Sequence, residues 1–341
     1  MEQEPTNLPA QIAEAIVSIP KGLTPGVIKA LDRLVGATVD IPVAWLQQKK
    51  AKIDAQTESY KLVENAIAQA VATGAAADEE TAQRAMNVLV RKEYRKQVNR
   101  EAVAIAMVED LREQATRIGG ADQILPSAEP DEDWLNVFER YAEDASSERL
   151  QGLWGRVLAG ELRKPGRYST RTLRFLSEFS QADALTFETF SKCAFGDSAP
   201  TSLAKLYDGA NIRHLIYLES SGLIQGVSGG GLQRKIAFNE QGASFMLEGD
   251  LAIVFKGEPN STISQDIIAL TPLGQELLSL VPSRKPREVA RAVALASRVP
   301  NIHDCYLGIR VRNDSGEFLQ PLEVLWVKET EQEPVIDGTS N

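Results

Sequence analysis

Residues 146–187 read SSERLQGLWGRVLAGELRKPGRYSTRTLRFLSEFSQADALTF and predict a series of short helices. The first has apolar residues at the spacing of one helix face: Leu150, Leu153, Trp154, Val157, Leu158 and Leu162. Pro165-Gly166 ends that helix, and Ser169 is placed to cap the next one. Ser180, followed three residues later by Asp183, has the pattern of a capping box for a third helix. This stretch predicts a central helical bundle over residues 131–195.

Long helices are expected ahead of this bundle, over residues 23–118. Thr24-Pro25 has the form of a helix N-cap followed by proline at the first helical position. The alanine-rich stretch of residues 53–73 favours helix, and Asp78 is placed to cap a longer helix after it. Helices of this length carry apolar stripes that need a partner, so an αα-hairpin or a homo-oligomer is expected. Residues 1–22 are predicted to form a flexible N-terminus.

The pattern changes after residue 200, where strand-like runs join the helices. Residues 210–221 have a helical pattern, and the glycine-rich turn Gly226–Gly231 between LIQG and QRKIAFNE predicts a β-hairpin. A later strand runs into a helix that has Thr271 as N-cap and Pro272 at its first position. This order of helix, β-wing and helix predicts a winged-helix-like module over residues 200–285.

The end of the chain adds a C-terminal α/β piece over residues 286–327 and a disordered acidic tail over residues 328–341. The expected fold class is therefore mainly α. Long N-terminal helices and a central helical bundle are followed by a winged-helix-like α+β module.

The composition is that of a globular protein in a reducing compartment. The 341 residues are 43% hydrophobic and 25% charged, with a formal net charge of −10. Such an acidic chain is not a general binder of polyanions, which need local positive charge. The only cysteines, Cys193 and Cys305, cannot build a disulfide framework, which favours the cytoplasm. The start, MEQEPTNLPAQ, has no signal-peptide pattern, and no apolar run is long enough to cross a membrane.

Two stretches of the chain are locally basic. Residues 84–100, the first basic island, carry six cations against Glu93, and residues 149–174, the second basic island, carry seven against Glu161. A helix N-terminus with guanidinium groups beside it is a candidate anion site. The alternatives are pairing with the protein's own carboxylates for the second island and a solvated helix face for the first. The candidate anion- or partner-binding residues of the second island are Arg163, Lys164, Arg167, Ser169, Arg171 and Arg174, and those of the first are Arg91, Lys92, Arg95, Lys96 and Arg100.

No catalytic or metal-binding motif is recognisable. The chain has two histidines, His214 and His303, and zinc sites usually take four ligands in spaced pairs. Gly226–Gly231 lacks the lysine and the following helix of a phosphate-binding loop. We therefore expect no cofactor and no metal, and we favour a non-enzymatic protein, with an enzyme that lacks a known motif left open.

Three blocks of the sequence together resemble known bacterial families. They are RAMNVLVRKEYRKQVNREAV, the stretch 146–187 quoted above, and HLIYLESSGLI followed later by ALTPLGQELL. The chain resembles, over roughly residues 22–285, a bacterial family recorded as a domain of unknown function (number 2806 in that series). The later blocks also resemble the C-terminal part of the abortive-infection alpha proteins, a family linked to phage exclusion. The resemblance implies an all-α front part, a winged-helix-like rear part and a role in phage defence, and it implies no catalytic residue.

Three functions are open at this point. The first is a non-enzymatic, oligomeric interaction protein that acts in phage defence as sensor, adaptor or effector, with a protein partner or a phage component. The second is a nucleic-acid-binding regulator that uses the winged helix and the basic islands. The predicted recognition helix offers only Arg213 and His214 as donors, which favours protein contacts there. The third is a membrane-acting effector that uses residues 24–50, where Trp45 precedes a cluster of lysines.

Overall fold

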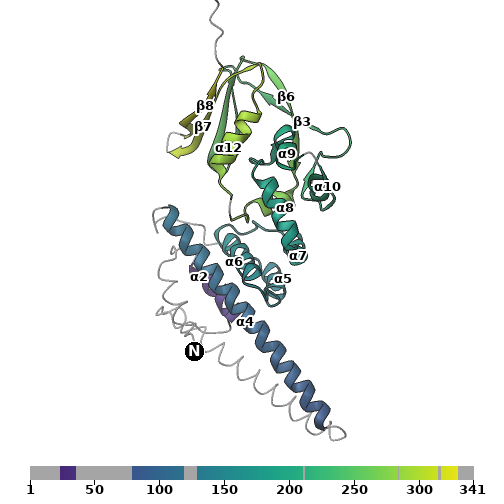
Figure 1. Ribbon diagram of the computed structural model, residues 1–341. Coiled ribbons are helices and arrows are strands. Elements are labelled where there is room, and N and C mark those ends of the chain that lie inside the picture. Colours follow the sequence, from purple (N-terminus) through teal and green to yellow (C-terminus); the bar gives the residue numbers. More distant parts are fainter. Residues whose placement is uncertain are drawn as a thin grey trace, which may run out of the picture. The chain divides into compact units, whose positions relative to one another are not determined.

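The computed structural model describes residues 24–35, 79–118, 129–209, 212–282, 284–313 and 316–328 (Figure 1). The chain divides into two compact units, Met1–Ser177 and Glu178–Asn341, which we call unit 1 and unit 2. The division falls inside the segment 131–195 that the sequence groups as one bundle.

Unit 1 is helical in its described part. Its helices are α2 (Thr24–Val35), α4 (Glu79–Ile118), α5 (Glu132–Ala142), α6 (Glu148–Arg163) and α7 (Thr170–Glu178). The predicted long helix is confirmed as α4, and both α2 and α6 pack against it. The proposed cap Asp78 and the alanine-rich stretch of residues 53–73 lie outside the described residues.

The core of unit 1 lies between the C-terminal half of α4 and the helices α2, α5 and α6. Val103, Met107 and Leu111 recur every four residues on α4 and are buried. Aromatic rings from α5 and α6 fill the space beside them. Trp134 and Phe138 stack with ring centroids 5.2 Å apart, and Phe138 meets Trp154 edge to face at 5.6 Å. The predicted apolar face of residues 150–162 is therefore confirmed as a core face.

Gly155 allows α6 to approach α4 closely. A Cβ atom built on Gly155 would lie 2.5 Å from Ala106 Cβ and 2.8 Å from the Met107 backbone nitrogen. Backbone atoms of a packed helix cannot move aside cheaply, so the two helices would have to separate. Gly152, one turn earlier on α6, has only the flexible Arg156 guanidinium within 4 Å.

The pair Gly155 and Gly152 gives a prediction with an internal control. Gly155→Ala is expected to lower the free energy of unfolding by about 1–3 kcal/mol because it overpacks the helix contact. Gly152→Ala is expected to raise it by about 0.5 kcal/mol, since alanine favours the helix and meets no obstacle. Urea denaturation followed by tryptophan fluorescence measures both, and equal effects of the two substitutions would contradict the close approach.

Unit 2 contains two antiparallel sheets of four strands each within its described residues. Sheet A consists of β1 (Ser198–Pro200), β2 (Ile224–Gln225), β3 (Leu232–Ala237) and β6 (Thr262–Leu270). Sheet B consists of β4 (Ala243–Glu248), β5 (Leu251–Gly257), β7 (Ile302–Asn313) and β8 (Gly316–Val327), in that order. Its helices are α8 (Gln181–Ser191), α9 (Thr201–Tyr207), α10 (Arg213–Ser220), α11 (Pro272–Leu278) and α12 (Pro286–Ala296).

Helix α12 covers the inner face of sheet B (Figure 1). Val289, Ala290 and Val293 of α12 are buried there, as are Ile253 and Leu307 of the sheet. The indole of Trp326 on β8 donates a hydrogen bond of 2.9 Å to the carbonyl of Ala294. Sheet B and α12 therefore form a second core, which draws strands from both predicted segments, 200–285 and 286–327.

The fold class predicted from the sequence is wrong for this half of the chain. Unit 2 is not a winged-helix module behind a mainly helical chain. The strands β4 and β5 lie between β3 and β6 in the sequence, but they pair with β7 and β8 in sheet B and not with sheet A. Val254 of β5 pairs with Tyr306 of β7, a contact between segments far apart in the chain. The predicted hairpin around Gly226–Gly231 is also wrong, since β2 and β3 both pair with β6 and not with each other.

The loop Gly226–Gly231 instead wraps around a carboxylate. The backbone N–H groups of Gly226 and Val227 each donate a 2.8 Å hydrogen bond to Glu219 Oε1. Ser228 N–H donates one of 2.9 Å to Oε2. Successive N–H groups of this kind form an anion-binding concavity. The hydrogen bond from the Ser228 side chain, with the backbone bonds, lowers the pKa of Glu219 below its usual value.

Because the pKa of Glu219 is lowered in the folded state, its contribution to stability should depend on pH. The contribution is present above the unfolded pKa and is lost as the pH falls through the lower folded pKa. We expect Glu219→Gln to cost about 1 kcal/mol at pH 7. Urea denaturation between pH 7 and pH 3 should show this difference shrinking as the pH falls. A difference that stays constant would contradict the role of the ionised carboxylate.

Candidate functional site

The second basic island is largely engaged inside unit 1. Arg163 Nη1 lies 2.7 Å from Asp110 Oδ2, so this guanidinium ties α6 to α4. Burial lowers the pKa of Arg156, and the charge of Asp110 opposes that effect. The guanidinium carbon of Arg167 lies 5.6 Å from the ring centroid of Tyr168. These contacts match the alternative in which arginines of the second island join parts of the fold.

The Pro165-Gly166 turn is held by a buried carboxylate, Glu161, whose side chain belongs to α6. Its oxygens accept hydrogen bonds of 2.5 Å from Gly166 N–H and 3.0 Å from Tyr168 N–H. The Trp134 indole donates to the carbonyl of Tyr168 at 2.7 Å. The turn is thus fixed from both sides, which explains why a glutamate lies among apolar residues of this helix.

The start of α7 has the predicted cap. Ser169 Oγ accepts a hydrogen bond of 3.3 Å from Thr172 N–H and lies 3.1 Å from the Thr172 hydroxyl. Lys164, Arg171 and Arg174 are exposed near this turn, and Arg174 has contacts of its own. Of the six predicted residues of this island, Lys164 and Arg171 are exposed cations whose side chains form no hydrogen bond or ion pair with the described residues.

The first basic island divides into two groups on α4. Lys96 Nζ lies 2.6 Å from Glu143 Oε1, and that hydrogen bond raises the pKa of Lys96. Arg100 Nη1 lies 3.4 Å from Glu143 Oε2. Both cations therefore join α4 to the end of α5. Arg91, Lys92 and Arg95 are exposed.

The apolar face of α2 is covered within unit 1. Val27, Ala30, Leu31 and Leu34 are buried, and α2 packs on α4. Arg33 Nε lies 3.0 Å from Glu139 Oε2 of α5. The described part of residues 24–50 thus has no apolar face left for a membrane, and residues 36–50 lie outside the described residues. Among the helices that the structure describes, none has the length and apolar character needed to span a bilayer.

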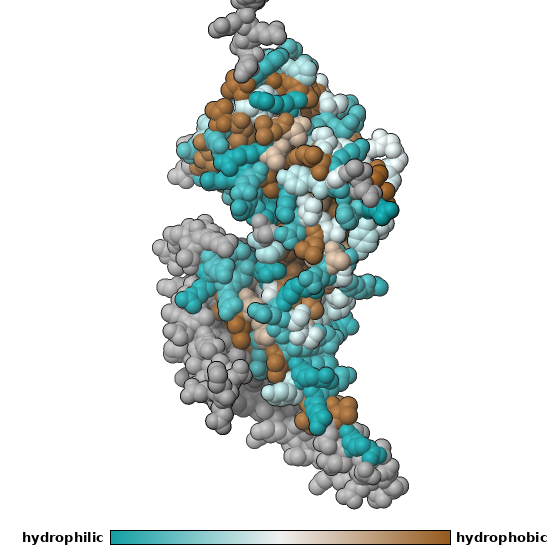
Figure 2. Space-filling model, in the orientation of Figure 1, coloured by the Kyte–Doolittle hydropathy of each residue, from teal (hydrophilic) through white to brown (hydrophobic). Residues whose placement is uncertain are grey.

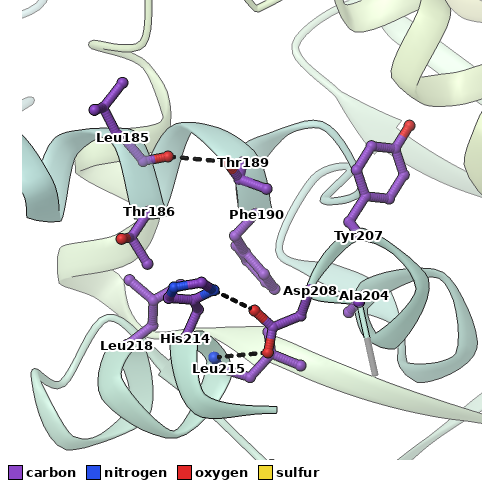
Figure 3. Close-up of a pocket in the computed structure, with 11 residues that line it drawn as sticks. Leu185, Thr186, Thr189, Phe190, Ala204, Tyr207, Asp208, His214, Leu215 and Leu218 are labelled. Atoms are coloured by element: carbon purple, nitrogen blue, oxygen red, sulfur yellow. Dashed lines mark hydrogen bonds and ion pairs between the residues drawn. The ribbon is translucent and has the colours of Figure 1, made fainter. Parts of the chain in front are cut away.

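A pocket of about 450 Å³ opens between α8, α9 and α10 of unit 2 (Figure 3). Its apolar lining includes Leu185 and Phe190 of α8 and Leu215 and Leu218 of α10. Helix α8 begins with the predicted capping box of Ser180 and Asp183, which is confirmed. The pocket combines an apolar floor with a few polar groups, the usual composition of a binding site.

The polar group of the pocket is the pair His214 and Asp208, whose side chains point toward one another (Figure 3). His214 Nδ1 lies 2.7 Å from Asp208 Oδ1. The Asp208 side chain is 4% exposed and the His214 side chain 69% exposed. The carboxylate thus orients the imidazole at the mouth of the pocket, where its second nitrogen is accessible.

The two threonine hydroxyls that line the pocket are not available as nucleophiles for the pair of His214 and Asp208. The Thr186 hydroxyl donates to the carbonyl of Ala182 at 2.9 Å, and the Thr189 hydroxyl donates to that of Leu185 at 3.0 Å. A hydroxyl that donates to its own helix cannot give its proton to the imidazole, as a serine-type nucleophile must. The geometry therefore suits binding better than acyl transfer.

The cysteines are placed as core residues. Burial raises the pKa of both Cys193 and Cys305 to about 12, so neither thiol is a ready nucleophile or metal ligand. His303 is exposed, whereas Cys305 beside it is buried. Within the described ranges, no group of three histidine, cysteine or carboxylate side chains is close enough to hold a metal ion.

Exposed apolar side chains gather on the three helices that form the pocket. We call them the α8–α10 surface: Leu185, Leu206, Tyr207, Ile212, Ile216 and Tyr217. Leu185 and Tyr207 also line the pocket. Leu215 and Leu218 of α10 are buried and line the pocket, whereas Ile216 of α10 and Ile212, the residue before the helix, are exposed. This surface was not predicted from the sequence, although apolar residues on both sides of a short helix are a signal for it.

The match to a protein family spans parts of both units. Residues 83–209 match the model of a family described as a protein of unknown function (DUF2806). The resemblance to that family is therefore confirmed over this part of the chain, which runs from α4 to α9. This match does not support the resemblance to the abortive-infection alpha proteins. No curated protein and no solved structure matches the chain.

Proposed function

We propose that this protein works without catalysis and binds a protein partner through the α8–α10 surface. Its residues 83–209 match the DUF2806 family. The observation that carries this proposal is the exposure of six large apolar residues, five on three neighbouring short helices and Ile212 directly before α10. Scattered apolar residues are normal on a protein surface, but a set of them on neighbouring helices, two of which also line a pocket, is typical of an interaction site.

The shape of the surface favours a partner with an amphipathic helix. The pocket is open and apolar, and the exposed residues Leu185 and Tyr207 stand at its edge. A helix that lays its apolar face on such a groove places one large side chain in the pocket and others along the rim. His214 at the mouth offers a ring nitrogen to a polar group of that helix. In the second basic island, by contrast, Arg163 is already paired with Asp110 inside unit 1.

Site-specific photocrosslinking in bacterial cells tests this proposal. A photoreactive phenylalanine analogue replaces Ile216, and a matched control places it at Lys235, an exposed residue of β3. We expect a discrete crosslinked partner from position 216 and none from position 235. The partner, identified by mass spectrometry and purified, should bind the natural chain and lose at least tenfold in affinity for Ile212→Ser/Ile216→Ser, as expected for two apolar contacts. Crosslinks only to a second copy, or the same pattern at both positions, would contradict the proposal.

We propose phage defence in the cytoplasm as the biological role of this binding. Only the sequence resemblance supports that role. If it is correct, cells that express the natural chain give fewer plaques than cells that express the well-folded Ile212→Ser/Ile216→Ser variant. An unchanged plaque count against a broad panel of phages would remove this role, and the crosslinking result would still decide the binding. Homo-oligomerisation stays a prediction from the long helices.

A further inference from the structure

The N-terminal half of α4 extends beyond the helices that pack on its C-terminal half (Figure 1). Val88, Leu89 and Val90 point in different directions around the helix, and all three are exposed. Apolar and charged side chains lie side by side on this end of α4 (Figure 2). This segment therefore has surface available to a partner, in contrast to Val103 and Met107 farther along the helix, which are buried.

The cations of α4 separate by side of the helix. At roughly 100° per residue, Arg91 and Arg95 share one side, whereas Lys96 and Arg100 lie about 140° away from them. Lys96 and Arg100 face α5, where Glu143 neutralises them. Arg91 and Arg95 face away from that contact, Lys92 lies between the two sides of the helix, and all three are exposed. We call Arg91, Lys92 and Arg95 the α4 basic stripe.

Two features of the α4 basic stripe point to its ligand. The only acidic residue between positions 84 and 100 is Glu93, which lies on the side toward α5, so nothing within this segment neutralises the stripe. Tyr94, between Lys92 and Arg95 in the sequence, is 70% exposed. Cations in line beside an exposed aromatic ring are the combination with which proteins hold single-stranded nucleic acid.

We propose that the α4 basic stripe binds the phosphate backbone of a nucleic acid and that Tyr94 stacks on an unpaired base. Arg91 and Arg95 are separated by about 6 Å along the helix axis, so each guanidinium can take a different phosphate. An acidic protein surface would account for the cations only, whereas a nucleic-acid strand accounts for the cations and the ring. A second copy that docked through the same face would present the same cations to the stripe. This binding is independent of the α8–α10 surface.

Fluorescence anisotropy with labelled 20-nucleotide single strands and 20-base-pair duplexes tests the inference on the full chain. The test variant is Arg91→Ala/Lys92→Ala/Arg95→Ala, and the matched control removes three exposed cations of unit 2, Lys192→Ala/Lys235→Ala/Arg287→Ala. We expect salt-dependent binding by the natural chain and at least about a tenfold loss for the test variant. The slope of log affinity against log salt should fall by about 2 to 3 for duplex, since each neutralised phosphate contributes about 0.9. The control variant should keep both values.

Tyr94→Ala separates stacking from charge. It should weaken single-strand binding by about tenfold and leave duplex binding nearly unchanged, while Tyr94→Phe keeps the ring and the affinity. An equal loss on both ligands would overturn the role of Tyr94. No binding at 50 mM salt, an equal loss in the test and control variants, or equally effective competition by polyglutamate of the same charge would overturn the inference itself.

Discussion

Arg284→Ala is expected to lower the free energy of unfolding of unit 2 by about 3 kcal/mol or more. The Arg284 side chain is 7% exposed and forms an ion pair with Glu248 at the end of β4. It also donates hydrogen bonds to the carbonyls of Ala194, at 2.6 Å, and Ser191, at 3.2 Å. Removing one partner of a buried ion pair leaves the other charge without compensation, which typically costs about 3–5 kcal/mol. Arg284 thus connects α8, sheet B and the segment before α12.

Pulsed thiol labelling in urea measures this loss, because the only cysteines of the chain, Cys193 and Cys305, are both buried in unit 2. The double variant Arg284→Met/Glu248→Leu is the matched control. Since it removes both charges and keeps apolar volume, we expect it to recover much of the stability that Arg284→Ala loses. Lys285→Ala, at an exposed neighbouring position, should change the stability by less than about 0.5 kcal/mol. A loss below about 1 kcal/mol for Arg284→Ala would show that the pair is not a structural link.

Glu161→Ala is expected to lower the free energy of unfolding of unit 1 by about 2–4 kcal/mol. The glutamate is 1% exposed, and it accepts hydrogen bonds from the backbone N–H groups of Gly166 and Tyr168. Each buried N–H group that loses its acceptor costs about 1–3 kcal/mol. Tyr168 would also lose its position against Gly160, where a Cβ atom would come within 2.7 Å of the tyrosine ring.

Urea denaturation followed by tryptophan fluorescence checks this value, with Glu161→Gln and Glu148→Ala as controls. Glutamine keeps one acceptor oxygen, so its cost should be clearly smaller than that of alanine. Glu148 is exposed at the start of the same helix, and its replacement should have little effect. If Glu161→Ala left the stability unchanged but abolished function in cells, the segment around the Pro165-Gly166 turn would be a site, and our structural interpretation of it would be wrong.

The sequence predicted those parts of the fold that depend on neighbouring residues. Thr271 caps α11 with Pro272 in its first turn, as the pattern indicated, and α4 runs to Ile118. The sheets could not be predicted in this way. Strand β4 reads ASFMLE, which lacks a clear alternation, and its neighbour β5 pairs with β7 across a long intervening segment. Such pairings depend on contacts distant in sequence, and periodicity within one strand does not contain them.

The sequence also could not predict which cations of the basic islands are paired. Composition locates their cations, but the carboxylates that engage them come from other segments: Asp110 for Arg163 and Glu143 for Lys96. Only the structure therefore separates engaged cations from exposed ones such as Arg171 and Arg95. The carboxylate beneath Gly226–Gly231 was missed for the same reason, since Glu219 comes from α10, before the loop.

Isothermal titration calorimetry with the partner identified by crosslinking at position 216 tests the central claim most directly. Burial of the α8–α10 surface predicts a negative heat-capacity change on binding. It also predicts that Ile212→Ser/Ile216→Ser loses the affinity, whereas Lys164→Ala/Arg171→Ala keeps it. Loss of affinity in the Lys164/Arg171 variant, with unchanged affinity in the Ile212/Ile216 variant, would contradict the account and move the binding site to the second basic island.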